Sequence, residues 1–425
     1  MPQPSGPQSK IDITLDGQSH QFSPILLRDL CQCHMCVDPS TRQKLFSTTD
    51  IPENIAPIVE RGIDADSVRL KWRNDISGFP HDHVTDLKTE SLSSLAKVGS
   101  PIAPFQPPER ALWEEARFRK DVRDLDYEAY MSDDSILHQA LQYLHTHGLV
   151  FLTNVPEQES SVASIAERIG PVKNTFYGYT WDVRSIPQAK NVAYTSQDLG
   201  FHMDLLYMEQ PPHLQFLHCI RASTAGGVST FTDSYKAALD LFRHDLEAFI
   251  TLSRLPVNYH YNHLESNYYF HSRPVLELKQ PLFGGDYKLE DLSQLFYTAQ
   301  KSGFDITKWL DNIAWSPPFQ APFSNQQSQR PSLVEPMDTM NSNISEWHNA
   351  AKLFDQLIHR TEGVYRRMMK PGECALFDNR RVLHAREAFE VGDIGKERWL
   401  RGAYLDRDPY RSKMRVLQER FGQQG

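Results

Sequence analysis

Cysteine, basic clusters and long apolar runs are scarce in this sequence, and each scarcity excludes a class of protein. Only five of the 425 residues are cysteine, and three of these lie within six residues, so a secreted disulfide framework is not expected. No apolar stretch is long enough to cross a bilayer, which excludes a membrane span, and a membrane is not an expected partner. The formal charge of -9 is spread along the chain without a block of Lys and Arg, so nucleic acid is not an expected partner.

The N-terminus also lacks the features of a targeting signal. Residues 1–6 have neither the basic and apolar regions of a secretory signal nor the arginine-rich helix of a transit peptide. We therefore expect a cytoplasmic protein whose substrate is a small molecule.

The first part of the chain reads as a small β-rich domain, residues 1–97. Residues 11–22 alternate apolar and polar side chains around Asp16-Gly17, which is typical of a short hairpin, and residues 68–72 alternate again. The following residues, 98–120, are rich in proline and charge and are predicted to be a linker.

Residues 121–425 are predicted to form a second, larger domain. A helical period after Asp133 ends at Gly148 and precedes a buried strand at 149–152, and short strands with turn residues follow. The stretch from about 260 to 345 shows no clear element. The pattern favours a mainly β domain with flanking helices, an α+β chain overall.

His202 and Asp204, which are separated by Met203, form a candidate metal site. Positions two residues apart on a β-strand project to the same face, so His202 and Asp204 can bind one cation together. With a distant second imidazole they would form the facial triad of non-haem iron oxygenases, which leaves positions open for co-substrate and oxygen. Taken alone, the pair is more often a hydrogen-bonded pair than a metal site.

His384 is the candidate third ligand, because it lies just beyond an apolar strand at residues 374–377. A jelly-roll barrel brings an early and a late strand side by side, so a wide gap between ligands is expected. The sequence thus predicts Fe(II) bound by His202, Asp204 and His384 as the catalytic centre.

Arg398 and Ser229 are candidate ligands of the co-substrate 2-oxoglutarate. Arg398 follows His384 by fourteen residues, and Ser229 follows the turn Gly226-Gly227. A guanidinium can bind the distal carboxylate in a bidentate pair that a hydroxyl supports. The alternative for Arg398 is a surface salt bridge.

These residues belong to a set of motifs that resembles the γ-butyrobetaine dioxygenase and trimethyllysine dioxygenase family. The resemblance runs from about residue 10 to 415, apart from a divergent stretch near 255–345. The matching segments are the N-terminal Cys-x-Cys-x-x-Cys, Phe176-Tyr-Gly-Tyr-Thr-Trp181, Asn191-Val-Ala-Tyr194, His202-x-Asp204, Gly226-Gly227, Phe377-Asp-Asn-Arg380 and Arg398-Trp-Leu-Arg-Gly-Ala-Tyr404.

The resemblance implies a TauD-like double-stranded β-helix (jelly-roll) catalytic domain over residues 121–425, a zinc-binding N-terminal domain and a homodimer. It implies Fe(II) and 2-oxoglutarate as well, with molecular oxygen as the third reactant and ascorbate as an optional reductant. His202, Asp204 and His384 carry over as iron ligands and Arg398 as the co-substrate anchor, in agreement with the interpretation of the residues.

The aromatic motifs are more similar to γ-butyrobetaine dioxygenase, in which aromatic rings enclose a trimethylammonium group. The substrate-binding residues implied here are Tyr177, Trp181, Asn191, Tyr194 and Tyr404. Electron-rich ring faces attract a quaternary ammonium that donates no hydrogen bond, at about 0.5 to 2 kcal/mol per desolvated ring. Without the resemblance, four scattered aromatic residues would be assigned to the core.

One departure from the family concerns Leu205. The family enzyme has a tyrosine there that helps to hold the substrate carboxylate, and leucine cannot donate to a carboxylate. Together with the divergent stretch near 315–319, this leaves open a second substrate class with the same chemistry: trimethyllysine or an amino-acid-like compound. A catalytically inactive metal-binding regulatory protein is the other alternative.

Cys31, Cys33 and Cys36 supply three thiolates within one short segment, and a closed tetrahedral zinc site needs one more ligand. His83 matches the family position, with His81 and His34 as competitors. Because such a site has no open coordination position, the zinc is expected to contribute to folding rather than to chemistry.

Overall fold

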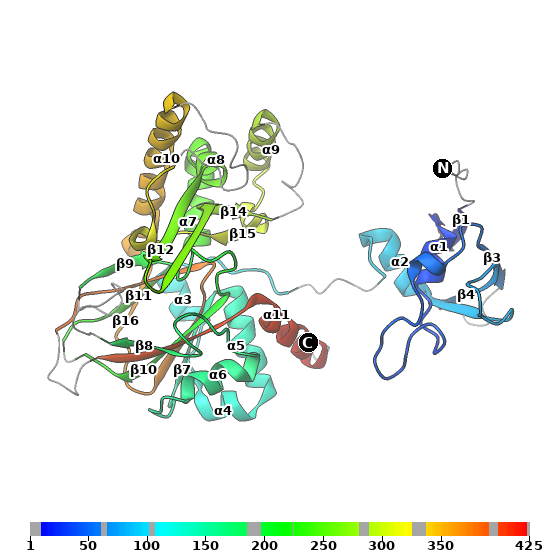
Figure 1. Cartoon of the computed structure of the whole chain (residues 1–425), viewed down its shortest axis with the longest axis horizontal. Helices are drawn as coiled ribbons and strands as arrows, with labels where there is room; N and C mark the ends of the chain where they lie inside the picture. Colours follow the sequence, from blue (N-terminus) through cyan, green and yellow to red (C-terminus); the bar gives the residue numbers. More distant parts are fainter. Residues whose placement is uncertain are drawn as a thin grey trace. The chain divides into compact units, whose positions relative to one another are not determined.

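The computed structural model describes residues 10–60, 66–101, 107–184, 197–223, 225–279, 289–324, 337–390 and 398–422. The chain divides into two compact units, residues 1–106 and 107–425 (Figure 1). Within the described stretches, no helix combines the length and the apolarity that crossing a membrane requires.

The N-terminal unit is β-rich and has its own apolar core. Its elements are β1 (Ile11–Leu15), β2 (Gln18–Phe22), α1 (Pro24–Asp29), η1 (Thr48–Asp50), β3 (Ala56–Glu60), β4 (Ser67–Arg73), β5 (Val84–Lys88) and α2 (Thr89–Val98). Asp16 and Gly17 both have positive φ, as the tight turn of a two-residue hairpin requires, and β1 pairs antiparallel with β2. The strands expected at 11–22 and 68–72 are therefore confirmed.

Two antiparallel sheets carry the second unit. A six-stranded sheet has the order β6-β7-β17-β10-β19-β8, with only β6 and β7 parallel, and a four-stranded sheet has the order β16-β11-β18-β9. Their strands are β6 (Leu125–Asp126), β7 (Leu149–Thr153), β8 (Trp181–Arg184), β9 (Leu199–His202), β10 (Leu214–Arg221), β11 (Ser229–Asp233), β16 (Val364–Arg367), β17 (Glu373–Asp378), β18 (Val382–Arg386) and β19 (Trp399–Leu405).

The helices of this unit form two groups (Figure 1). In the first group, α5 and α6 contact strands of the six-stranded sheet, and α11 contacts both helices. In the second group, α7, α8 and α10 pack on one another, and α9 contacts α8. The helices are α3 (Glu115–Asp121), α4 (Tyr127–Ser132), α5 (Asp134–Thr146), α6 (Ser161–Ile169), α7 (Ser234–His244), α8 (Leu246–Arg254), α9 (Leu289–Lys301), α10 (Met337–Ile358) and α11 (Arg407–Phe421).

Helix α5 shows how local sequence sets these boundaries. The Asp133 side chain accepts a hydrogen bond from the Ser135 amide and caps the first turn. Gly148 follows the last turn with φ +78°, and a Cβ there would lie 2.8 Å from a methyl group of Val382. The predicted helix and the buried strand that follows it, β7, are therefore confirmed.

The residues expected to form a linker, 98–120, are shared between the two units. Helix α2 ends at Val98, whereas residues from 107 onward belong to the second unit. There the indole of Trp113 is buried and donates a 2.6 Å hydrogen bond to the carbonyl of His147. Phe118 of α3 packs against Tyr365, with ring centroids 4.7 Å apart. Buried aromatic contacts of this kind fix the later part of the predicted linker.

The divergent stretch contains regular structure that the sequence did not reveal. It includes a two-stranded sheet of β12 (Pro256–His263) and β13 (Asn267–Pro274), and a second pair of β14 (Leu276–Leu278) and β15 (Leu310–Ile313). Two short 3-10 helices of this stretch are η3 (Ile306–Lys308) and η4 (Pro317–Phe319), and a third, η5 (Thr361–Gly363), follows α10 outside it. The unit therefore mixes helix and sheet, and the double-stranded β-helix winding stays a prediction.

Candidate active site

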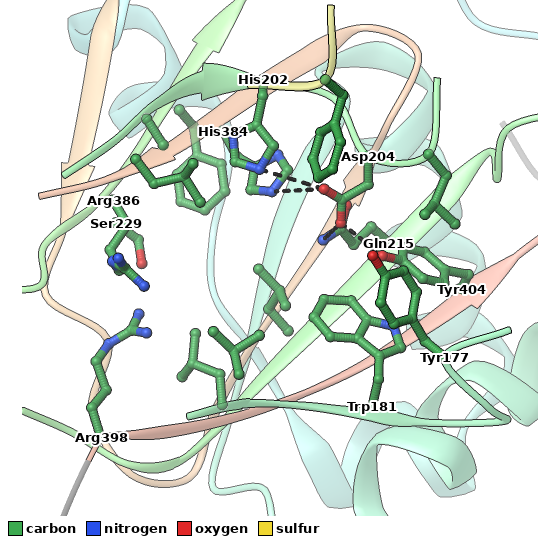
Figure 2. Close-up of a pocket in the computed structure, with 18 of the residues that line it drawn as sticks. Tyr177, Trp181, His202, Asp204, Gln215, Ser229, His384, Arg386, Arg398 and Tyr404 are labelled. Carbon is green, nitrogen blue, oxygen red and sulfur yellow. Dashed lines mark hydrogen bonds and ion pairs between the residues drawn. The ribbon is translucent and has the colours of Figure 1, made fainter. Parts of the chain in front are cut away.

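The two predicted histidine ligands meet across neighbouring strands. His384 of β18 is the register partner of His202, the last residue of β9, and their ring centroids are 4.1 Å apart. Oδ1 of Asp204 lies 3.4 Å from Nε2 of His202 and 4.0 Å from Nε2 of His384. The structure thus brings one carboxylate and two imidazoles, far apart in sequence, within 4.8 Å of one another (Figure 2).

The prediction that His202 and Asp204 lie on one strand is wrong. Strand β9 ends at His202, so the two side chains do not project from one strand, and Asp204 lies in the turn that follows, where Leu205 has φ +63°. The backbone of Asp204 is held instead by the side chain of Asn379, which accepts from its N–H at 2.9 Å and donates to its C=O at 3.0 Å. These two bonds replace the strand pairing that ends at His202.

The protonation of this group suits a divalent metal. Burial alone would raise the pKa of Asp204, but the neighbouring His202 and His384 lower it to about 2. Burial, and then the neighbouring His202, lower the pKa of His384 to about 3. Nδ1 of His202 lies 2.9 Å from the carbonyl oxygen of Gly200. Because a carbonyl oxygen can only accept a hydrogen bond, Nδ1 carries the proton of the ring, and Nε2 keeps its lone pair for a metal. One carboxylate and two imidazoles are the donor set of a facial iron(II) site, and the residues fit it.

The three side chains open onto a pocket lined by residues of both sheets. Figure 2 shows Arg386, Arg398 and Ser229 at one end of it and Tyr177, Trp181 and Tyr404 at the other, with the two histidines and Asp204 between them. Apolar side chains from five different strands form the walls: Val183, Leu199, Leu217, Phe231 and Leu400. Polar groups are thus concentrated at defined places in an otherwise apolar cavity, as in most small-molecule sites.

Arg398 is a buried cation in this pocket, with 5% of its surface exposed. It makes no ion pair with any residue that the structure describes, and its guanidinium lies 5.5 Å from the ring centroid of Phe389. Burial, and then the charge of Arg386, lower the pKa of Arg398 to about 10. A buried guanidinium without a carboxylate calls for an anionic ligand, and Ser229 lines the same end of the pocket.

Arg386 is a second pocket arginine that the sequence reasoning missed. It follows His384 by two residues on β18 and is 6% exposed, and its Nη2 donates to the carbonyl of Gln197 at 2.5 Å. Alternation along the strand is the signal that could have found it, because positions two apart share a face.

The predicted aromatic residues that the structure describes lie at the far end of the pocket. Trp181 stacks on Tyr404 with ring centroids 5.1 Å apart. The two strands that carry them, β8 and β19, can approach this closely because residue 402 is glycine, where a Cβ would overlap the indole of Trp181. Asn191 and Tyr194, the other two predicted substrate residues, lie outside the described residues.

Two further aromatic residues, Tyr207 and Phe319, also line the pocket, and the sequence reasoning did not name them. Their ring centroids are 5.3 Å apart, and the Tyr207 hydroxyl lies 3.3 Å from that of Tyr177. Phe319 comes from η4 in the divergent stretch. The departure at Leu205 and the segment at 315–319 were the available signals, but neither shows which side chain enters the pocket.

A second metal group lies in the N-terminal unit. Nε2 of His83 lies 3.6 Å from Sγ of Cys31 and 3.5 Å from Sγ of both Cys33 and Cys36. Tetrahedral zinc, with Zn–S of about 2.3 Å and Zn–N of about 2.0 to 2.1 Å, separates sulfur and nitrogen ligands by about 3.5 to 3.6 Å. The four side chains therefore form a Cys3His site with the spacing of zinc, and of the three candidate histidines His83 is the one in this group.

Two residues that the sequence gave no reason to select support this site. Oδ2 of Asp75 lies 2.7 Å from Nδ1 of His83, which directs Nε2 of that ring to the sulfurs. Oδ1 of Asp75 accepts from the fully buried Arg28 at 2.6 Å, and Arg28 also donates to Sγ of Cys36 at 3.2 Å. The ligands are thus fixed by an outer layer of charged partners.

Comparison with known proteins finds a matching family for each of the two units. The sequence model of the taurine catabolism dioxygenase TauD, TfdA family matches residues 102–404, and that of the gamma-butyrobetaine hydroxylase-like N-terminal family matches residues 8–83. Dioxygenase str8 of Strobilurus tenacellus is 34% identical over 92% of this chain and 84% of its own length.

Two further relatives carry the names expected from the motifs. A gamma-butyrobetaine dioxygenase of Pseudomonas sp. (strain AK-1) is 28% identical over 95% of this chain and 92% of its own length. A trimethyllysine dioxygenase of Meyerozyma guilliermondii is 25% identical over 94% of this chain and 91% of its own length. The resemblance inferred from the motifs is confirmed, and the chain belongs to the TauD, TfdA family of dioxygenases.

Proposed function

We propose that this dioxygenase uses Fe(II) and 2-oxoglutarate to hydroxylate an unactivated C–H bond of a small quaternary-ammonium carboxylate such as γ-butyrobetaine. One observation carries the proposal: His202, Asp204 and His384 converge on a pocket that has aromatic faces at one end and, at the other, a buried guanidinium that pairs with no carboxylate of the described residues. Iron and 2-oxoglutarate are expected throughout the TauD family, and the donor set and Arg398 fit them.

The chemistry of oxidation comes from the bound metal and co-substrate, with oxygen converting 2-oxoglutarate to succinate and carbon dioxide while one oxygen atom enters the substrate. The protein binds and orients. Arg398, with Ser229 beside it, holds the distal carboxylate of 2-oxoglutarate, and the apolar walls between the two ends exclude water. Tyr177 and Trp181 position the substrate cation, so that one C–H bond faces the metal.

A second candidate substrate class is trimethyllysine or another amino-acid-like compound, with the chemistry unchanged. Leu205 supports it, because a leucine replaces the tyrosine that would hold the carboxylate of γ-butyrobetaine. The 34% identical relative is named only as a dioxygenase, whereas the relatives named for γ-butyrobetaine and trimethyllysine are less similar.

The test is turnover of the purified full-length protein with Fe(II) and 2-oxoglutarate, in separate reactions with γ-butyrobetaine, trimethyllysine and free amino acids. Succinate release that one substrate stimulates, with one added oxygen atom in that substrate by mass spectrometry, supports the proposal and selects the class. Absence of succinate under all conditions would support an inactive metal-binding protein instead. Parallel reactions with and without ascorbate show whether a reductant is needed.

Three further properties remain proposals: structural zinc at the Cys3His site, a homodimer and a cytoplasmic location. The sulfur-to-nitrogen distances support zinc. The resemblance to the γ-butyrobetaine dioxygenase family supports the dimer. Metal analysis, sedimentation velocity and cell fractionation test the three in turn.

A further inference from the structure

Several hydrogen bonds from other side chains hold the backbone and the carboxylate of Asp204. Its position depends on side chains, since strand β9 ends two residues earlier and Leu205 has a positive φ. Asn379, which is 1% exposed and lies between β17 and β18, fixes its backbone through two hydrogen bonds of 2.9 and 3.0 Å. What remains to be set is the rotation of the carboxylate itself.

Two donors set that rotation. The hydroxyl of Tyr404 donates to Oδ2 of Asp204 at 2.7 Å, and Nε2 of Gln215 donates to the same oxygen at 2.8 Å (Figure 2). Gln215 of β10 and Tyr404 of β19 are register partners, so the sheet presents both donors side by side. Both are buried, with 0% and 2% of their surface exposed, so water does not compete for the bonds.

The other carboxylate oxygen is directed toward the imidazoles. Oδ1 of Asp204 is the atom that lies 3.4 Å from Nε2 of His202 and 4.0 Å from Nε2 of His384. A carboxylate oxygen that already accepts two hydrogen bonds has no lone pair directed at a metal. The two oxygens are therefore separated by role: one faces the metal position and the other faces the sheet.

The geometry points to Tyr404 and Gln215 as positioning residues that restrict Asp204 to binding the iron through Oδ1 alone. The inference rests on the proposed function. A carboxylate that bound through both oxygens would occupy one more coordination position. Three open positions are needed, because 2-oxoglutarate takes two and oxygen takes one. Tyr404 is thus more than a wall of an aromatic cage: its hydroxyl acts on the metal ligand, while its ring stacks on Trp181.

Tyr404→Phe separates these two roles, because it keeps the ring and removes only the hydroxyl. The full-length protein, loaded with zinc and free of iron, is titrated with Fe(II) under anaerobic conditions without co-substrate. We expect the dissociation constant for Fe(II) to rise roughly 10- to 100-fold, as is typical when a partner of a metal ligand is lost. We also expect more succinate to be released per substrate molecule oxidised.

Tyr207→Phe is the matched control. It removes another buried tyrosine hydroxyl of the same pocket, one whose hydrogen bond goes to Tyr177 rather than to Asp204. We expect its Fe(II) affinity to equal that of the wild type. Gln215→Met, which removes the second donor, should weaken Fe(II) binding in the same way and serves if Tyr404→Phe does not fold by circular dichroism.

The result that overturns the inference is wild-type Fe(II) affinity and wild-type coupling of succinate to product in both Tyr404→Phe and Gln215→Met. His202→Ala distinguishes this from a failure of the proposed function. If His202→Ala still binds Fe(II) like the wild type, the iron site itself is wrongly assigned. If His202→Ala loses the metal while both other variants keep it, only the positioning role fails.

Discussion

Replacing Arg398 by methionine should move two properties in opposite directions. Methionine keeps most of the aliphatic stem and removes the charge from a side chain that is 5% exposed and makes no ion pair with a described residue. The folded protein without ligand should become more stable, whereas 2-oxoglutarate should bind more weakly. Replacing an arginine that only stabilises the fold would rarely raise the stability and weaken 2-oxoglutarate binding together.

The expected magnitudes follow from the burial of the charge. Burial, more than any other cause, lowers the pKa of Arg398 from its usual value to about 10, so at neutral pH the pocket holds the charged form at a cost of about 3 kcal/mol. Its removal should raise the free energy of unfolding by up to that amount. The charge-assisted pair with the ligand contributes about 1.5 to 3 kcal/mol, so the dissociation constant of 2-oxoglutarate should rise roughly 10- to 150-fold.

The assay compares urea unfolding of the ligand-free protein with anaerobic titration of 2-oxoglutarate into the Fe(II)-loaded protein. Arg401→Met is the matched control, because Arg401 lies on β19, three residues after Arg398, but pairs with Asp182 at 2.7 Å and Glu159 at 3.2 Å. That variant should lose a little stability and keep its 2-oxoglutarate affinity. The reasoning is refuted if Arg398→Met lowers the free energy of unfolding and leaves the affinity unchanged.

Three further predictions concern other parts of the molecule. Gly402→Ala should displace the indole of Trp181, because a Cβ at residue 402 would overlap it. KM for the organic substrate should rise, with little change in the affinity for 2-oxoglutarate. Equal KM values in the wild type and the variant would contradict this packing argument. Burial lowers the pKa of His218 from 6.5 to about 4. Between these two pH values the unfolded chain binds a proton at His218 that the folded protein does not bind. The free energy of unfolding should therefore fall by about 3 kcal/mol as the pH falls from 6.5 to 4. In His218→Leu, urea unfolding should show a smaller loss over that range, and an unchanged loss would show that other groups cause it. Cys36→Ser should lower the zinc content and make the N-terminal unit sensitive to protease, while anaerobic Fe(II) binding stays intact; full zinc occupancy by elemental analysis would count against the Cys3His site.

Local signals account for the parts of the fold that could be predicted. The Asp16-Gly17 turn, the capped helix after Asp133 and the apolar strand that follows Gly148 depend on residues close in sequence. The divergent stretch could not be predicted, because β12 and β13 are held by pairing with each other and carry no clear alternation of buried and exposed residues.

The candidate site shows the same limit. The pair of His202 and Asp204 stands out within three residues, but the turn that carries Asp204 depends on Asn379, which lies 175 residues away. The role of the Tyr404 hydroxyl likewise follows from its register with Gln215, a non-local property of the sheet. The strand pattern and the spacing along the sequence indicated His384 and Arg398, the motif resemblance agreed, and only the folded structure could show which groups surround them.

The measurement that tests the central claim most directly is the anaerobic visible spectrum of the full-length protein with Fe(II) and 2-oxoglutarate. Chelation of 2-oxoglutarate to iron in this pocket predicts a metal-to-ligand charge-transfer band in the wild type. The band should be absent from His384→Ala and should need a higher 2-oxoglutarate concentration in Arg398→Met. A wild-type protein without the band, or a His384→Ala protein that retains it, would contradict the account.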